Sequence, residues 1–125
     1  MLLKQSFIIQ YFNFITNHIV NWIMQSITAQ ALKIKMDSKE DLQLIDVREP
    51  DEHAAFNIGG TLIPLNEIVQ QASKIATDKP VIIYCHHGIR SQIAIQRLQE
   101  KFEFTHLVNL IGGTAAWQKQ FNPIA

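Results

Sequence analysis

The sequence predicts an α/β domain with a central parallel sheet of about five strands and helices on both faces. Short apolar runs that suit strands alternate with segments of helical periodicity along the chain. The run Val81–Tyr84 is apolar without alternation, which is typical of a strand covered on both faces of a parallel sheet. At 125 residues, of which 47% are apolar, the chain can form one globular domain with its own core.

The first part of the domain is predicted to contain two strands, each followed by a helix. Ile27 begins a strand, and Thr28 caps a helix over residues 29–36, because its hydroxyl can accept a backbone N–H of the first turn. Residues 42–47 form an apolar run that predicts the second strand. This strand leads into a helix whose first turn is residues 49–52, where proline and acidic side chains are favoured.

The middle of the chain predicts a third strand over residues 61–65, with a proline near its end, and a helix over residues 67–74 capped by Asn66. After the strand Val81–Tyr84, the next helix begins at Ser91. The predicted buried face of that helix consists of Ile93, Ala94, Leu98 and Phe102.

Residues 105–110 return as the last predicted strand, and a glycine pair beginning at Gly112 turns the chain into a helix over residues 114–120. Ligands of parallel α/β sheets bind at the carboxyl ends of the strands. Cys85, Asp46 and Gly112 all fall at such ends. This edge of the sheet is therefore the predicted site.

Cys85 is the only cysteine of the chain, which excludes an internal disulfide and a resolving cysteine in the same chain. A lone cysteine is often a small buried hydrophobe, but this one lies between a strand and a loop that opens into a helix. The free N–H groups of such a loop and helix favour the thiolate form. We therefore expect Cys85 to be a nucleophile. Any group that becomes bound to it must be transferred to another molecule.

The loop from Cys85 to Arg90 can curl so that successive backbone N–H groups point inward and form an anion nest around the sulfur. Gly88 permits a positive φ within it. Ser91 can cap the following helix and offer its hydroxyl to the sulfur. Arg90 can bind an anionic donor or brace the loop through a carboxylate, for which Asp46 is the candidate.

Residues 1–23 differ from the rest of the chain, since they are rich in apolar side chains and contain one charged residue, Lys4. Polar and apolar positions recur three or four residues apart, which predicts an amphipathic helix. Polar residues interrupt the apolar run well short of the roughly 20 residues of a membrane span, and secretory-signal features are weak. Either this helix docks on a membrane surface, a partner or the domain, or it is upstream sequence before a natural start at Met24, which we favour. We expect a cytoplasmic protein whose domain covers residues 24–125.

The charged residues exclude some classes of function. Eleven basic residues balance eleven acidic ones without a basic cluster, so no nucleic-acid partner is expected. Cys85, His86 and His87 are consecutive and cannot easily converge on a tetrahedral metal ion, so no metal is expected. The two histidines form either a polar loop surface or a rim that gains charge at low pH. His18, His53 and His106 are expected to be ordinary residues without partner spacing.

Four charged residues follow the second predicted strand. Asp46 and Arg48 form either a simple ion pair at the strand end or a support for the site, and the sequence leaves both interpretations open. Glu49 and Glu52 are expected to be the solvated first turn of a helix.

The segment Cys85–Ser91, with the sequence CHHGIRS, resembles the active-site loop of the rhodanese family, the single-domain sulfurtransferases. Three other segments resemble further signatures of that family in the same order, namely residues 44–50, 58–65 and 112–117. Together the four segments cover about residues 27–117. The resemblance implies the rhodanese-like fold.

The resemblance also implies a two-step reaction that needs no cofactor. The Cys85 thiolate takes a sulfane sulfur from thiosulfate or from a persulfide, either a small molecule or a protein, and cyanide or a thiol then removes it. The implied site comprises the catalytic Cys85, the loop residues His86, His87, Gly88, Ile89, Arg90 and Ser91, and the supporting Asp46 and Arg48. Because His86 and His87 stand where family members often carry a cation, dianionic thiosulfate should be attracted less.

Two other functions compete with sulfur transfer. The first is a non-catalytic rhodanese-like module that binds partners or carries a persulfide. The second is a phosphatase or arsenate reductase, which the loop disfavours because only four residues lie between Cys85 and Arg90. The related phosphatases have one residue more, which makes room for a tetrahedral phosphoryl group.

Overall fold

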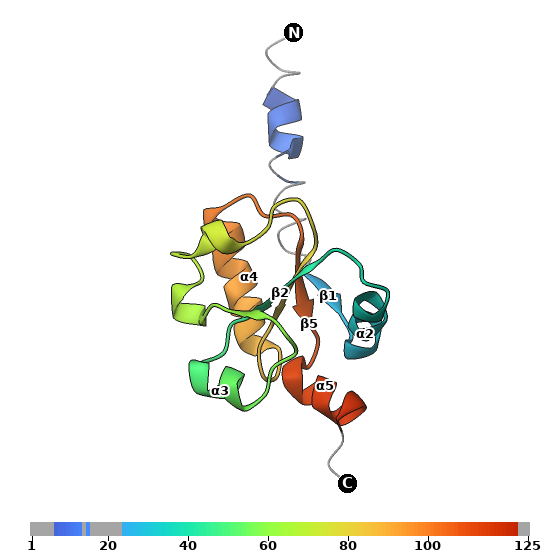
Figure 1. The fold of residues 1–125 in the computed structure, drawn as a ribbon. Helices are drawn as coiled ribbons and strands as arrows, with labels where there is room; N and C mark the ends of the chain where they lie inside the picture. The colour runs from blue at the N-terminus through green and yellow to red at the C-terminus, as the bar shows by residue number, and fades with distance from the viewer. Residues whose placement is uncertain (1–6, 14, 16–23, 123–125) are drawn as a thin grey trace.

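The computed structural model describes residues 7–13, 15 and 24–122. Within them one parallel sheet has the strand order β1-β5-β4-β2-β3 (Figure 1). The strands are β1 (Gln25–Ile27), β2 (Gln43–Asp46), β3 (Thr61–Leu62), β4 (Val81–Tyr84) and β5 (Leu107–Leu110). The helices are α2 (Ala29–Asp37), α3 (Pro50–Ala55), α4 (Ile89–Lys101) and α5 (Gly113–Phe121), with 3₁₀ helices η1 (Leu65–Glu67) and η2 (Ala72–Lys74). The predicted fold class is confirmed.

The central strand β4 pairs with β2 on one side and with β5 on the other. Asp46 pairs with Tyr84, and Ile83 pairs with Asn109, so the three strands end at nearly the same level. Because all strands are parallel, the residues that follow them meet at one edge of the sheet. This edge carries Cys85, directly after β4.

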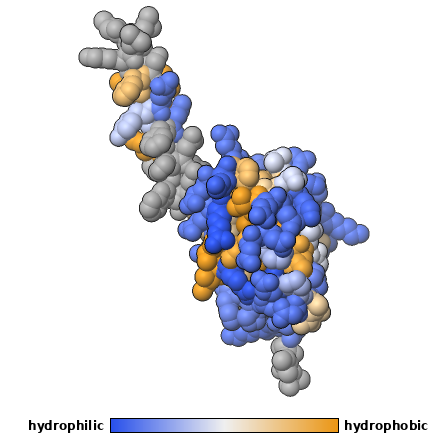
Figure 2. Space-filling model, turned by 90° about the vertical axis from the view of Figure 1, so that its left-hand side faces the viewer, coloured by the Kyte–Doolittle hydropathy of each residue, from blue (hydrophilic) through white to orange (hydrophobic). Residues whose placement is uncertain are grey.

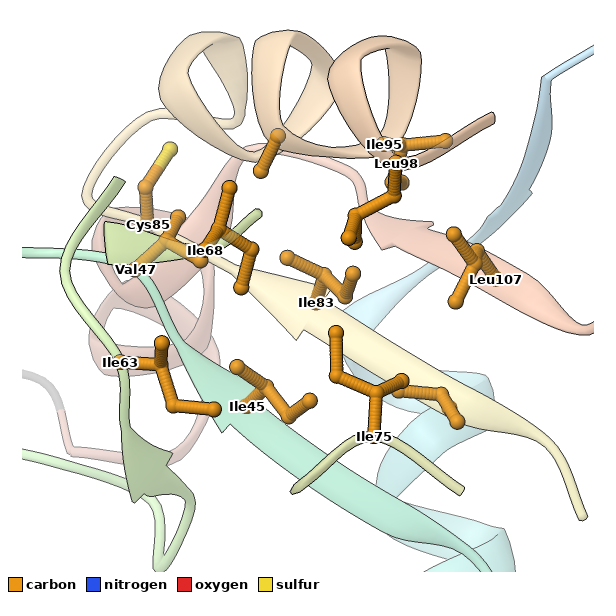
Figure 3. Packing of buried hydrophobic residues seen from close by; sticks show 12 residues of the cluster. Ile45, Val47, Ile63, Ile68, Ile75, Ile83, Cys85, Ile95, Leu98 and Leu107 are labelled. Carbon is orange, nitrogen blue, oxygen red and sulfur yellow. The ribbon is translucent and has the colours of Figure 1, made fainter. Parts of the chain in front are cut away.

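Two apolar cores lie on opposite faces of the sheet, because alternate side chains of each strand point to opposite sides. On the first face, the side chains of β2, β4 and β5 pack against α4 and against Ile68 and Ile75 (Figure 3). On the second face, Tyr84 and Leu110 pack with Leu32 of α2 and Trp117 of α5. Figure 1 shows α4 on one side of the sheet and α2 and α5 on the other. All side chains of β4 are buried, as its unbroken apolar run predicts.

The early element boundaries agree with the local signals. Thr28 is the N-cap of α2, and its Oγ1 accepts the N–H of Ala31 at 3.1 Å. Helix α3 begins at Pro50, preceded by Glu49 as N-cap, in agreement with the predicted acidic first turn. These signals are local, so they hold whatever the chain packs against.

The helix predicted over residues 67–74 with Asn66 as cap is wrong, since η1 ends at Glu67, residues 68–71 form turns and η2 follows over Ala72–Lys74. The segment begins with the β-branched pair Ile68 and Val69, which form helices less readily. The Gln43 side chain then donates to the Lys74 carbonyl and accepts the Ala76 N–H, both at 2.8 Å, and so holds the chain where it leaves η2.

Strand β3 is shorter than the predicted 61–65, although the N–H groups of Ile63 and Leu65 still donate to the Asp46 and Val47 carbonyls at 2.9 and 3.1 Å. Helix α4 begins at Ile89 rather than at Ser91, and its N-cap is Gly88. Phe102, predicted on the buried face of α4, is 42% exposed, because the helix ends at Lys101. Ile95, which the prediction omitted, is buried instead.

Residues 7–13 and 15 are helical, as expected for the N-terminal segment, and their side chains are exposed. The rest of residues 1–23 lies outside the described part of the chain, so the expected start at Met24 stays a prediction. Among the described residues, no helix has the length and apolar character that crossing a bilayer requires. Figure 2 shows apolar patches between hydrophilic side chains on one face of the domain.

Candidate active site

Cys85 follows the last residue of β4, and its side chain continues the row of Val81 and Ile83 on the first face of the sheet. The residue is only 1% exposed. Figure 3 shows Cys85 at the end of the apolar cluster, with its sulfur directed toward the first turn of α4. The sulfur therefore lies between the apolar side chains of the first core and the backbone of the cysteine loop.

Three polar groups of the loop and of α4 reach the Cys85 sulfur. The Gly88 N–H donates to Sγ at 3.0 Å, and the Ser91 N–H approaches it at 3.4 Å. The Ser91 hydroxyl also lies 3.4 Å from Sγ. Backbone N–H groups at a helix start carry partial positive charge, so the Gly88 and Ser91 N–H groups stabilise negative charge on the sulfur, whereas the Ser91 hydroxyl donates its hydrogen to Asn109. The expected convergence of amides on the sulfur is present for Gly88 and Ser91.

Gly88 adopts φ +94°, as the sequence analysis anticipated. A Cβ at this position would lie 3.2 Å from the Gly112 nitrogen and 3.3 Å from the Leu110 oxygen. The Gln92 side chain donates to the Gly88 carbonyl at 2.8 Å. The left-handed backbone and this hydrogen bond hold the Gly88 N–H toward the sulfur.

Helix α5 holds the loop from the other side. The Thr114 N–H donates to the Cys85 carbonyl at 2.9 Å, and the Ala115 N–H donates to the His86 carbonyl at 3.0 Å. The His86 Nδ1 lies 3.1 Å from the Thr114 hydroxyl. A Cβ on Gly113 would overlap the Cys85 carbonyl oxygen, so only glycine permits this approach. The glycine pair thus serves a close contact between backbones as well as the predicted turn.

Arg90 forms a bidentate ion pair with Glu52 of α3, with N–O distances of 2.6 and 2.8 Å. The sequence analysis proposed Asp46 for this role and expected a solvated Glu52, and both expectations are wrong. The hydrogen bond from Arg90 lowers the pKa of Glu52 to about 2. Asp46 cannot serve as the carboxylate partner of Arg90, because it is fully buried and already bound by other side chains.

Asp46 and Arg48 form a buried ion pair, with Arg48 Nε and Nη2 donating to the carboxylate at 2.9 and 2.7 Å. Burial alone would raise the pKa of Asp46, but hydrogen bonds from Arg48 and His53 outweigh it, and the pKa lies below its usual value. His53 Nδ1 is 2.9 Å from Asp46 Oδ2, so the expectation of a histidine without a partner is wrong. Arg48 also donates to the Phe56 carbonyl at 2.5 Å. This network ties the end of β2 to α3.

Asn109 of β5 is a site residue that the sequence analysis missed. Its Oδ1 accepts the Ser91 hydroxyl at 2.5 Å, and both residues are buried. The Ser91 hydroxyl therefore links Asn109 to the Cys85 sulfur rather than capping α4. The available signal was an amide side chain inside an otherwise apolar strand, where a buried polar group needs a partner.

The remaining loop side chains face outward. His87 is exposed, Ile89 is 67% exposed, and His86 is half-buried against the α5 start. The rings of His86 and His87 contact each other edge to face, with centroids 4.1 Å apart. In the described part of the chain, no group of three or more His, Cys, Asp or Glu side chains could hold a metal ion.

The sequence matches the rhodanese-like domain family over residues 28–120. The putative sulfur carrier protein YrkF of Bacillus subtilis is 36% identical over 92 residues, which cover 73% of this chain and 49% of that protein. The thiosulfate sulfurtransferase GlpE of Coxiella burnetii is 35% identical over 81 residues, which cover 64% of this chain and 75% of that protein.

A solved structure agrees with these sequence matches. The crystal structure of a rhodanese-like domain protein from Staphylococcus aureus matches with a TM-score of 0.68 and 30% identity, covering 75% of this chain and 91% of that one. The chain spans about half the length of YrkF. The family match, in contrast, includes β2 to β5, the cysteine loop and all but the last residue of α5. The chain therefore belongs to the rhodanese-like domain family.

Proposed function

We propose that this protein is a sulfurtransferase that moves a sulfane sulfur from thiosulfate or a persulfide to cyanide or a thiol through a persulfide on Cys85. The observation that carries the proposal is the set of donors around the sulfur, the N–H groups of Gly88 and Ser91. By analogy with oxyanion holes, each such donor contributes on the order of 2 to 4 kcal/mol to stabilising a developing anion. The names of YrkF and GlpE support the same chemistry.

In the first step the Cys85 thiolate attacks the outer sulfur of the donor. A new S–S bond forms, and the bond between the donor's two sulfur atoms breaks with its electron pair going to the leaving group. Thiosulfate leaves as sulfite, and a persulfide leaves as a thiolate. Cys85 then carries one extra sulfur, about 2 Å beyond Sγ.

In the second step the acceptor attacks the outer sulfur of the persulfide. The S–S bond breaks, Cys85 returns as a thiolate, and the acceptor leaves as thiocyanate or as a new persulfide. The amides of Gly88 and Ser91 stabilise the leaving thiolate, because they already point at the sulfur.

Mass spectrometry of the protein after incubation with thiosulfate or with a small persulfide tests the proposal. We expect the mass of one sulfur atom to be gained on the peptide that contains Cys85 and to be lost on addition of cyanide, with release of thiocyanate. The Cys85→Ser protein is the control and should show neither change. Turnover by that variant would remove the proposal.

A second candidate is a persulfide carrier without turnover of its own. The burial of Cys85, which is 1% exposed, favours it because a buried persulfide resists small acceptors. The name of the relative YrkF, a putative sulfur carrier protein, also supports it. A Cys85 persulfide that persists in the presence of cyanide and small thiols would favour the carrier, whereas rapid thiocyanate release favours the enzyme.

A further inference from the structure

The loop of the candidate site contains one permanent cation, and that cation is neutralised. Arg90 is the only Lys or Arg among residues 85–91. Both its terminal nitrogens are bound by the Glu52 carboxylate, at 2.6 and 2.8 Å. Glu52 is itself held in place, because its Oε1 also accepts the Glu49 N–H at 3.1 Å. The positive charge nearest the sulfur in the loop is therefore cancelled by a fixed partner.

The neighbouring elements add no free positive charge. Helix α3 carries acidic side chains and one histidine, and the first turn of α5 has no charged residue. Arg48, at the end of β2, is paired with the buried Asp46. Glu49 adds a further negative charge, which acts on Arg90 through space. His86 and His87 are the remaining titratable groups of the loop, and a neutral imidazole offers no fixed charge.

Two of the side chains exposed beside the cysteine are apolar. Ile89, the residue after Gly88, is 67% exposed, and Ile111 is 48% exposed. Their segments touch, since Gly88 lies against the Leu110 carbonyl and the Gly112 nitrogen. These two isoleucine side chains offer a hydrated dianion no hydrogen bond in exchange for its water, but they suit a donor with an uncharged body.

The two donor classes differ in the charge that they bring to this site. Thiosulfate enters as a dianion and sulfite leaves as a dianion, so both stages need positive charge beyond the dipoles of the amides. A protonated persulfide brings no charge on its reacting sulfur and releases a single thiolate. Resting on the function proposed above, we propose that Glu52 is a specificity-determining residue that neutralises Arg90 and thereby selects small persulfide donors over thiosulfate.

The substitution Glu52→Gln tests this inference. Glutamine can still accept from Arg90 and from the Glu49 N–H, so the loop keeps its brace while Arg90 becomes an uncompensated cation. The probes are thiosulfate and the persulfide of 2-mercaptoethanol, whose body is uncharged. The readout is the second-order rate constant of sulfur loading onto Cys85, followed by mass spectrometry of quenched samples. We expect the ratio of the thiosulfate to the persulfide rate constant to rise about tenfold.

Asp41→Asn is the matched control, because it also removes one negative charge from an ion pair. Its partner is Lys79, and the pair lies at the amino ends of β2 and β4, away from the loop. The control should leave the ratio of rate constants unchanged. The same shift in both variants would mean that net charge acts at long range, and it would overturn the assignment to Glu52.

Two further measurements keep the inference testable if the Glu52→Gln protein is unstable. Arg90→Gln removes the cation and leaves Glu52 alone, so the ratio should fall below that of the wild type. In the wild type, loading from thiosulfate should not slow as salt is raised, because no free cation steers the dianion. Loading that slows strongly with salt, or an unchanged ratio in Glu52→Gln, would overturn the inference while leaving sulfur transfer intact. Absence of loading from both donors would instead overturn the proposed function.

Discussion

Substituting Gly113 with alanine directly perturbs the contact that holds the cysteine loop. Gly113 has φ +58°, and a Cβ there would overlap the Cys85 carbonyl oxygen and lie 2.6 Å from that of His86. Neither neighbour can move freely, because both are backbone atoms whose carbonyls accept the first N–H groups of α5 at 2.9 and 3.0 Å. Alanine must therefore separate the loop from α5.

The expected loss of stability is the sum of one backbone cost and two weakened hydrogen bonds. An alanine with left-handed backbone costs roughly 1 to 2 kcal/mol. Separating the two backbones weakens two hydrogen bonds, each of which contributes about 1 kcal/mol. We therefore expect the free energy of unfolding to fall by about 3 to 4 kcal/mol. Displacing the loop by about 1 Å should also slow sulfur loading onto Cys85 at least tenfold.

Gly59→Ala is the matched control, because Gly59 also has a positive φ, +96°, but a Cβ there would meet no atom within 4 Å. It should cost only the backbone contribution and leave sulfur loading unchanged. Urea unfolding gives the free energies, and mass spectrometry of Cys85 gives the loading rates. If both variants lose the same stability and load sulfur equally fast, the contact with α5 does not hold the loop and the reasoning fails.

Three further substitutions and one control separate other contributions. Asn109→Asp places a carboxylate one hydrogen bond from Ser91, the serine that contacts the sulfur. Because this negative charge opposes a negative charge on the sulfur, alkylation of Cys85 by iodoacetamide should slow about tenfold. Equal rates in the two proteins would contradict the connection from Asn109 through Ser91 to the sulfur. Glu52→Gln should lower stability at neutral pH by about 1 kcal/mol, once the partial exposure of the ion pair is taken into account. Because arginine lowers the folded-state pKa of Glu52 from 4.5 to about 2, this difference in urea unfolding should shrink as the pH falls from 4.5 toward 2. Asp46→Asn should cost about 3 to 5 kcal/mol, because it leaves a buried arginine without its counter-charge. Asp41→Asn, at an exposed pair, should leave the unfolding midpoint unchanged.

Much of the fold could be predicted because its signals are local. The cap at Thr28, the proline at the start of α3 and the apolar run of β4 each act within a few residues. The wrong helix over residues 67–74 shows where this fails. There the side chain of Gln43, more than 30 positions away, binds the chain and overrides the weak local preference.

The sequence by itself determined the parallel α/β architecture and the place of Cys85 at a strand end, followed by a glycine with positive φ. These features depend on hydrophobic periodicity and turn chemistry, which neighbouring residues set. Only the tertiary structure decided that Arg90 pairs with Glu52 and that Asn109 binds Ser91. The contact between α5 and the cysteine loop was also visible only in the tertiary structure. These partners lie 18 or more positions apart, and the packing of separate layers, which no spacing along the chain encodes, selects which side chains meet.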